Sequence, residues 1–427
     1  EGELSIAERD ELLAEMTDEV AELVLRDNYD QARALGNARA QARPLLPVHR
    51  RMMSELERNG RLDRTLEALP SDEELAARAE AGTGLAAPEF AVLLAYVKMV
   101  LEHEISASAL PDEEWTRDVL ADYFPRPLRE RCGDRMASHA LRREIVTTSL
   151  VNEVVNRGGT SFVYRSVEET GASPEDVLRA YVIVRDVYGL RELWQAVEAL
   201  DNQVSTDAQT AVYLESRRLL DRAVRWLLQN RRSPLDVPTE IERLRPGVAR
   251  LLPELSTLFR GRERDSLREH IAELAGRGIP DDLADWATRV MYGFGLLDIV
   301  EVAQATGRDL AEVAGVYFVL SEQFRVDDLL SKISLLPRED RWQTLARMAL
   351  RYDLYAALAA LTAEVLGATS ADGEPEDRVG EWEQANASSI SRARNAIGDF
   401  DDSRADLAAL SVLLRQIRTL VRTSAAG

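Results

Sequence analysis

The glycine-rich stretch after residue 81 is the first place where a phosphate-binding turn could form. Gly82-Thr83-Gly84-Leu85-Ala86-Ala87 fits the spacing G-x-G-x-x-A, in which small residues let the backbone approach a dinucleotide pyrophosphate at a helix N-terminus. That chemistry needs a strand before the turn, and none is predicted there. Pro88 also suits the first turn of the next helix. We therefore interpret the stretch as a loop that binds no cofactor.

The four histidines do not fall into a metal-binding or catalytic pattern. They are His49, His103, His139 and His270. None lies in an H-E-x-x-H motif, and none has a glutamate three residues before it, which disfavours zinc hydrolases and di-iron bundles. A phosphate-binding loop with Lys-Ser or Lys-Thr and a G-x-S-x-G elbow are also missing from the sequence. We predict no catalytic residue and no metal ligand.

Five polar residues in the largely apolar segment 139–157 are candidates for a shared polar network. They are Arg142, Arg143, Glu144, Asn152 and Asn156. Buried amides and charges need partners, because an unpaired buried group costs roughly 1–3 kcal/mol. These residues could form a polar network beside a ligand or an interface. The favoured interpretation is a purely internal, structural network.

The helix that should position these residues spans residues 139–157. Its apolar residues surround most of the circumference, which is typical of a helix buried on nearly all sides. They are Leu141, Ile145, Val146, Leu150, Val151, Val154 and Val155. Val and Thr also suit a strand, but the length and the Gly158-Gly159 stop favour a helix. We expect neighbouring helices to pack around it.

Charge and cysteine content restrict the environment and the partners. The net charge of −21 disfavours nucleic acid and anionic membranes, which both need a basic surface. Cys132 is the single cysteine, so a reducing compartment, the cytoplasm, is expected. The longest apolar run, Phe90 to Leu101, contains Lys98 and is too short to span a bilayer. The start Glu-Gly-Glu, without Met or a signal peptide, suggests a piece excised from a longer polypeptide.

Capping signals predict helices along the whole chain of 427 residues. Capping boxes begin helices after Ser5 and Ser71, and Thr17 is expected to open a second helix that runs past Gly36. We predict an all-α multi-helix bundle. Its expected parts are residues 1–158, a duplicated part at 159–366, a flexible loop at 367–377 and C-terminal helices at 378–427.

The last helix is predicted from Ser403 to Arg422 and carries an apolar seam of alternating spacings of three and four. Its residues are Leu407, Leu410, Leu414, Ile417 and Val421. Such a seam is typical of a coiled coil. Docking on its own domain is the favoured interpretation, and pairing with another subunit is the alternative.

An internal repeat relates two parts of the chain. Residues 170–200 align without gaps on residues 306–336, a shift of 136 positions, with Thr-Gly at the start of both and apolar residues at matching places. Just downstream, Gln209-Thr210 corresponds to Gln343-Thr344. Matches at core positions indicate two copies of one helical unit, near 170–228 and 306–366.

Several motifs, in order, resemble the C-terminal region of the large bacterial NAD-specific glutamate dehydrogenases. They are Met16-Thr17-Asp18-Glu19-Val20-Ala21, Leu85-Ala86-Ala87-Pro88-Glu89-Phe90, His139-Ala140-Leu141-Arg142-Arg143-Glu144-Ile145 and Leu335-Leu336-Pro337-Arg338. The resemblance covers nearly the whole chain and is weakest after about Gly367. It implies a parent enzyme that oxidises L-glutamate to 2-oxoglutarate with NAD.

The resemblance also implies that this chain follows the catalytic domain and that the dinucleotide-binding unit lies upstream. No catalytic or cofactor-binding residue of the family can be carried onto this chain, so NAD is expected only in the parent. The expected partners are the upstream catalytic domain and other copies of the parent in a homo-oligomer. Asp27, Asn28 and Tyr29 are candidates for contact with the catalytic domain, because they lie nearest to it along the chain.

The first hypothesis is therefore a non-catalytic helical tail that braces the catalytic domain, forms subunit contacts or transmits regulation. Two further hypotheses remain open from the sequence. The chain could be a stand-alone helical adaptor that binds partner proteins, and a start codon just upstream of Glu1 would favour this alternative. It could also be a helical enzyme with an unfamiliar site, although no group of residues points to one.

Overall fold

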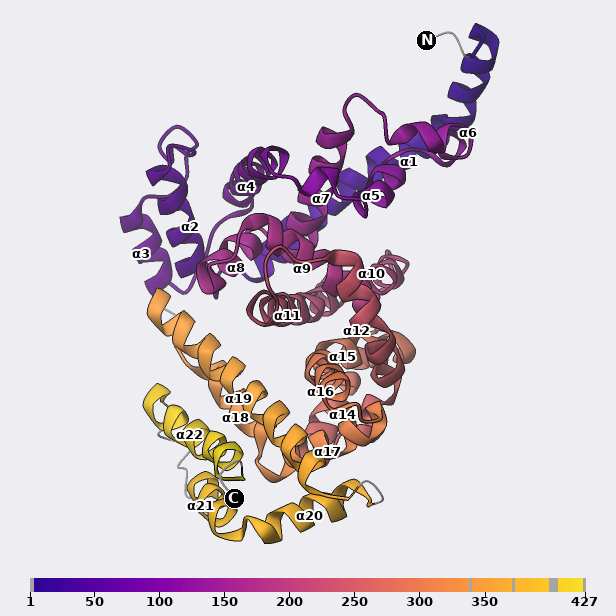
Figure 1. Cartoon of the computed structure of the whole chain (residues 1–427). Helices are drawn as coiled ribbons and strands as arrows, with labels where there is room; N and C mark the ends of the chain where they lie inside the picture. Colours follow the sequence, from indigo (N-terminus) through magenta and orange to yellow (C-terminus); the bar gives the residue numbers. More distant parts are fainter. Residues whose placement is uncertain (1–3, 338–339, 371–372, 399–405, 425–427) are drawn as a thin grey trace. The chain divides into compact units, whose positions relative to one another are not determined.

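The computed structural model describes residues 4–337, 340–370, 373–398 and 406–424, and every regular element in these ranges is helical (Figure 1). The predicted all-α class is confirmed. Two compact units are formed: the first comprises Glu1–Ile183 with Leu227–Pro238, and the second Val184–Trp226 with Thr239–Gly427. The divisions expected at residues 158, 366 and 377 stay predictions. Arg338 of the fourth motif and Ser403 at the expected start of the last helix lie outside the described residues.

The first unit is built around a long N-terminal helix and a buried central one. Its elements are α1 (Ile6–Ala40), α2 (Leu46–Arg58), α3 (Asp72–Glu80), α4 (Ala87–Ala107), η1 (Leu110–Asp112), α5 (Thr116–Tyr123), α6 (Arg126–Met136), α7 (Arg142–Gly158), α8 (Phe162–Thr170) and most of α9 (Pro174–Val187). Both predicted capping boxes, at Ser5 and at Ser71, are present. The sequence-based starts of α1 and α3 are therefore confirmed.

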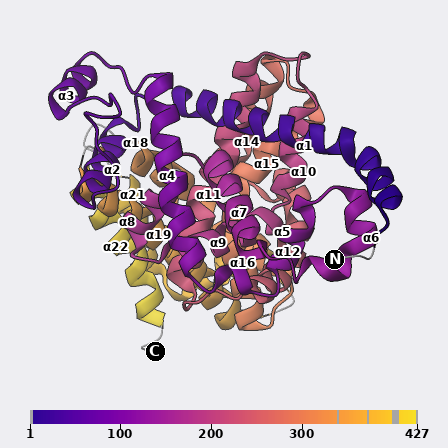
Figure 2. The same cartoon turned by 90° about the horizontal axis from the view of Figure 1, so that it is seen from above.

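The expected second helix start at Thr17 is wrong, because α1 continues through it as one unbroken helix (Figure 2). The Thr17 hydroxyl donates to the carbonyl oxygen of Leu13 at 2.8 Å. A threonine that bonds back four residues inside a helix satisfies its own hydroxyl and caps nothing. The capping pattern at Thr17 is thus a coincidence of residue types.

The central helix of the prediction is α7, which begins at Arg142 and ends at Gly158. Val146, Val151 and Val154 have no exposed surface. They pack within the first unit, where α7 contacts α1, α4, α5 and α8. The chain leaves the helix through Gly159, whose φ of 106° is in the region that favours glycine. The predicted burial on nearly all sides is confirmed for the apolar residues of α7 itself. Leu141 is a correction, because it precedes the helix and is 55% exposed.

The second unit is a succession of helices, of which α19 is the longest. Its elements are α10 (Leu190–Glu198), α11 (Thr206–Asn230), α12 (Val237–Leu251), η2 (Leu252–Glu254), α13 (Leu255–Leu258), α14 (Gly261–Gly276), α15 (Asp281–Tyr292), η3 (Gly293–Gly295), α16 (Leu296–Thr306), α17 (Leu310–Gln323), α18 (Val326–Leu335), α19 (Arg341–Ala368), α20 (Pro375–Ala385), α21 (Ala387–Gly398) and α22 (Leu407–Ser424). Three helices, α9, α11 and α12, each contain residues of both units, because a unit boundary falls inside each of them.

The seam of the last helix packs inside the second unit. Leu410, Leu414 and Ile417 are buried, and α22 lies against α19 and α21. These three seam residues dock intramolecularly, as the favoured interpretation expected, whereas Leu407 is 40% exposed and Val421 is half-buried. Pairing with another subunit stays a prediction. No described helix is both long enough and apolar enough to cross a membrane.

The two expected repeat copies have matching helix boundaries. Helix α17 begins and ends 136 positions after α9, and α18 begins 136 positions after α10. Gly171 and Gly307 both have a left-handed backbone after the preceding helix, and Gly189 and Arg325 both have one before the next. Such a correspondence is what two copies of one helical unit would give. The duplication itself stays a prediction.

Candidate functional site

Arg142 ties the start of α7 to the turn that follows α4. Its Nη2 donates to the carbonyl oxygen of Pro111 at 3.0 Å, and its Nη1 lies 3.4 Å from Oδ1 of Asp112. Both partners belong to η1. The guanidinium is half-buried, so this contact holds two sequence-distant segments together without offering a free charge to a ligand.

Arg143 makes a second link, to the C-terminal end of α4. Its Nη2 donates to the carbonyl oxygens of Ser106 and Ser108 at 2.8 and 2.9 Å, and the same guanidinium pairs with Asp112. The last carbonyls of a helix have no partner within the helix and carry partial negative charge. Arg143 therefore caps α4 in the way that a cation at a helix C-terminus is expected to.

The other three residues of the predicted network lie elsewhere on α7. Glu144 is exposed, Asn152 is half-buried and Asn156 is buried. Arg142 and Asn156 are fourteen positions apart, which at 1.5 Å per residue is about 21 Å along the helix. The structure therefore brings Arg142 and Arg143 together but separates them from the two asparagines.

The candidates for contact with the catalytic domain lie on α1 and differ in exposure. Asn28 is exposed, and its Nδ2 donates to the carbonyl oxygen of Val24 at 3.2 Å. Asp27 is exposed at the residue level, yet partial burial of its carboxyl raises its pKa. Tyr29 is half-buried, with the guanidinium of Arg33 5.2 Å from its ring centroid. Asp27 and Asn28 are therefore both exposed, whereas Tyr29 is not.

A charged cluster that the sequence did not reveal lies beside these residues, where α1, α4 and α7 meet. Asp30 on α1 accepts hydrogen bonds from Arg33 at 2.6 Å and from Arg157 of α7 at 3.3 Å. Lys98 of α4 is buried, and its Nζ has no hydrogen-bond partner among the described residues. Burial lowers the pKa of Lys98, and three nearby carboxylates act in the opposite direction. The Asp30–Arg157 contact fastens α1 to α7.

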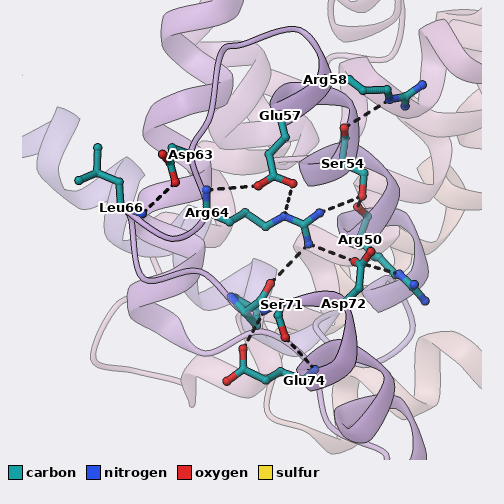
Figure 3. A network of polar contacts seen from close by, with 11 residues as sticks. Arg50, Ser54, Glu57, Arg58, Asp63, Arg64, Leu66, Ser71, Asp72 and Glu74 are labelled. Carbon is teal, nitrogen blue, oxygen red and sulfur yellow. Dashed lines mark hydrogen bonds and ion pairs between the residues drawn. The ribbon is translucent and has the colours of Figure 1, made fainter.

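An open cleft of about 540 Å³ lies between α2, α3 and the start of α4. Arg64 is one of its lining residues and lies at the centre of the polar network in Figure 3. Arg64 donates to Glu57 at 2.6 Å, to Asp72 at 3.1 Å and to the hydroxyl of Ser54 at 3.1 Å. Across the cleft, Arg78 makes a bidentate pair with Glu89 at 2.6 and 2.7 Å. Because both guanidiniums are already paired, the cleft presents no spare cation to an anionic ligand.

The stretch Gly82-Thr83-Gly84 is a turn between α3 and α4, as the sequence indicated. A Cβ at Gly84 would lie 2.4 Å from the backbone carbon of Ala42, so this glycine serves a close approach between two chain segments. The carboxylate of Glu89 accepts from the N–H of Ala86 at 2.6 Å. An intramolecular anion thus occupies the helix N-terminus that a pyrophosphate would need.

Two buried carboxyls in the second unit have strongly perturbed pKa values. Burial raises the pKa of Asp298 to about 7, against the opposing effect of the hydrogen bond that Trp226 donates at 2.7 Å. Burial also raises the pKa of Glu263 to about 7, and Ser321 donates to it at 2.9 Å. Sequence spacing gave no sign of either pair. Within the described ranges, no three His, Cys, Asp or Glu residues are placed to share a metal ion.

Comparison with known proteins matches two family models to separate parts of the chain. The model described as "Glutamate dehydrogenase, C-terminal" matches residues 82–419. The model described as "Bacterial NAD-glutamate dehydrogenase, catalytic domain" matches residues 1–38, which include most of α1. The first match covers well over half of the chain.

Three curated NAD-specific glutamate dehydrogenases match most or all of the chain. The NAD-specific glutamate dehydrogenase of Mycobacterium tuberculosis is 43% identical over 427 residues, which are 100% of this chain and 26% of that protein. That of Pseudomonas aeruginosa is 38% identical over the same share of each. That of Halomonas elongata is 37% identical over 381 residues, or 89% of this chain and 24% of that protein. The chain spans about a quarter of the length of these relatives.

The family models and the relatives agree with the resemblance read from the motifs. The chain belongs to the family of C-terminal regions of the NAD-specific glutamate dehydrogenases.

Proposed function

We propose that this chain is the non-catalytic, helical C-terminal region of an NAD-dependent glutamate dehydrogenase. The parent reaction converts L-glutamate, NAD and water into 2-oxoglutarate, ammonium and NADH. The observation that carries the proposal is the pair of family matches, in which the catalytic-domain model ends at residue 38 and the C-terminal model takes up most of the rest. The parent would act in the cytoplasm as a homo-oligomer.

The positions of the two lysines support a non-catalytic role. Oxidative deamination of an amino acid needs a lysine or carboxylate tuned by its site and open to the substrate. Lys98 is buried where three helices meet, and Lys332 pairs with Asp328 one turn before it on α18. Neither is among the residues that line the cleft in the first unit.

The packing of the first unit supports a bracing role. Helix α7 is buried among α1, α4 and α5. Arg143 and the Asp30–Arg157 contact fasten it to α4 and α1 through polar links. A helix that is buried and held on several sides fixes the position of α1 relative to the rest of the unit, because packed interiors are stiff. Such a unit is suited to hold a neighbouring domain in place.

The bracing role can be tested by deleting the segment that corresponds to residues 82–427 from the full-length parent. We expect the shortened protein to unfold at a lower temperature and to lose glutamate-dependent NADH formation, while NAD itself still binds. An unchanged Tm together with unchanged activity would show that the segment braces nothing. Discovery that residues 1–427 are translated as a separate polypeptide would favour the adaptor hypothesis instead.

A further inference from the structure

One side of α1 carries an uncovered apolar stripe. Ile6, Leu13, Val20, Val24 and Leu25 have exposed fractions of 72, 52, 43, 56 and 68%. The spacings of seven, seven and four from Ile6 to Val24 place those four side chains in one row along the helix. We call these five residues the outer face of α1. Asn28, an exposed member of the predicted contact residues, lies in the same row four positions after Val24.

Other residues of α1 are already packed against their own unit. Leu12, Ala34 and Ala38 are buried, and α1 contacts α4, α6 and α7. On the α6 side, the backbone N–H of Arg126 donates to Glu19 at 2.8 Å. The apolar surface of α1 is therefore wider than the part that the described elements of its own unit cover. A contiguous exposed apolar patch on a soluble protein marks an interaction surface.

The composition of this face indicates a protein partner. Between Leu13 and Asn28, the row carries Thr17, Val20, Ala21 and Val24 and no charged residue, whereas Asp10 lies in the same row nearer the start of the helix, four positions after Ile6. Charged residues are typically depleted at the core of a protein–protein interface. A nucleic acid or an anionic membrane would require basic side chains instead.

The preceding catalytic domain of the same polypeptide is the occupant that the observations favour. The whole outer face lies within residues 1–38, the part that matches the catalytic-domain model. The chain spans only about a quarter of its relatives, so most of each relative is protein outside this chain. We propose that the catalytic domain packs on the outer face of α1 and thereby makes α1 a shared element of both domains. This inference rests on the proposed function and adds the surface and the partner to it.

Hydrogen exchange of the α1 amides tests the proposal in the full-length parent polypeptide. We expect exchange over residues 6–30 to be roughly tenfold slower in the parent than in the 427-residue chain alone, because docking suppresses local opening. In the parent, Val24→Glu should restore the fast exchange. Val412→Glu on α22 is the matched control, because Val412 is 58% exposed, close to the 56% of Val24, and it should leave α1 protected.

Three outcomes would overturn the proposal. The first is equal α1 exchange in the parent and in the isolated chain, which would also be seen if another part of this chain covered the outer face. The second is an α1 that stays protected in the Val24→Glu parent. The third is an isolated chain that sediments as a dimer and that Val24→Glu converts into a monomer, since the occupant would then be a second copy. None of these results touches the proposed function, which fails instead if the isolated chain itself forms NADH from glutamate.

Discussion

Trp226 donates its indole N–H to Oδ1 of Asp298 across 2.7 Å in the interior of the second unit. The two residues are 72 positions apart, on α11 and α16. Asp298 is buried, and burial raises its pKa from 3.8 to about 7. A buried carboxyl with one neutral donor is held in its protonated form more readily than in water. The contact therefore links the stability of the second unit to pH.

The free energy of unfolding should fall as the pH rises from about 4 to about 7. The folded state binds the Asp298 proton more tightly than the unfolded chain does, and this difference stabilises the fold. The stabilisation is complete below the pKa that Asp298 has in the unfolded chain. It is lost as the pH rises to the pKa that Asp298 has in the folded state. Glu263, whose pKa is also raised to about 7, should act in the same direction. Urea unfolding between pH 4.5 and pH 8, which is about the interval over which these carboxyls titrate, measures the change in the free energy of unfolding.

Asp298→Asn should flatten much of this pH dependence. The amide oxygen can still accept from Trp226, but the side chain no longer titrates. Glu242→Gln, at an exposed position of α12, is the matched control and should leave the slope unchanged. A slope that is the same in the wild type and in Asp298→Asn would contradict the assignment.

Removal of the Arg143 cap should weaken the first unit. Arg143→Met keeps much of the side-chain volume but loses two hydrogen bonds to the end of α4 and the pair with Asp112. Because the guanidinium is partly exposed, we expect a loss of about 1–2 kcal/mol in the free energy of unfolding. Glu144→Gln, at the exposed neighbouring position, should change it by less than about 0.5 kcal/mol. Equal values for the two variants would remove the capping role.

The left-handed backbone at Gly307 predicts a cost for any side chain there. Gly307 has a φ of 66°, and a Cβ would meet nothing within 4 Å, so Gly307→Ala should lose about 1 kcal/mol through backbone strain alone. Gly380 lies inside α20, and a Cβ there would also meet nothing within 4 Å. Gly380→Ala should therefore gain about 0.5–1 kcal/mol. Chemical denaturation of the two variants measures both signs.

Arg378 should be among the least replaceable charges in the second unit. It is buried, donates to Thr369 Oγ1 at 3.0 Å and to the carbonyl oxygen of Leu366 at 3.3 Å, and pairs with Glu312. Arg378→Met leaves these acceptors without their donor, so a loss of about 3–5 kcal/mol is expected.

A proteolysis experiment localises this effect. Cleavage between α19 and α20 should accelerate in Arg378→Met, because α20 would no longer be fastened to α17 and α19. Arg392→Met, at an exposed position of α21, should cleave at the wild-type rate. Wild-type cleavage and stability in Arg378→Met would mean that packing around Trp382 holds α20 by itself.

Features that depend on neighbouring residues were predicted correctly from the sequence, whereas contacts between distant segments were not. The capping boxes at Ser5 and Ser71 and the burial of α7 depend on neighbouring residues, so spacing predicted them. The helix start predicted at Thr17 was wrong because a threonine can either cap a helix or hydrogen-bond back to a carbonyl inside one.

Contacts between distant segments had no local signature. Trp226 and Asp298 give no periodic signal that could pair them. The apolar residues of α1 were visible in the sequence, but periodicity does not say which side of a helix the rest of its unit leaves uncovered. Arg142 and Asn156 were grouped because they share one helix, whereas the length of α7 separates them.

Glutamate-dependent NADH formation by the isolated 427-residue chain, measured beside the full-length parent, tests the central claim most directly. The account predicts steady NADH production by the parent and none by the isolated chain at the same molar concentration. Turnover by the isolated chain would contradict it, because the chain would then contain the hydride-transfer machinery that we assign to the protein outside it.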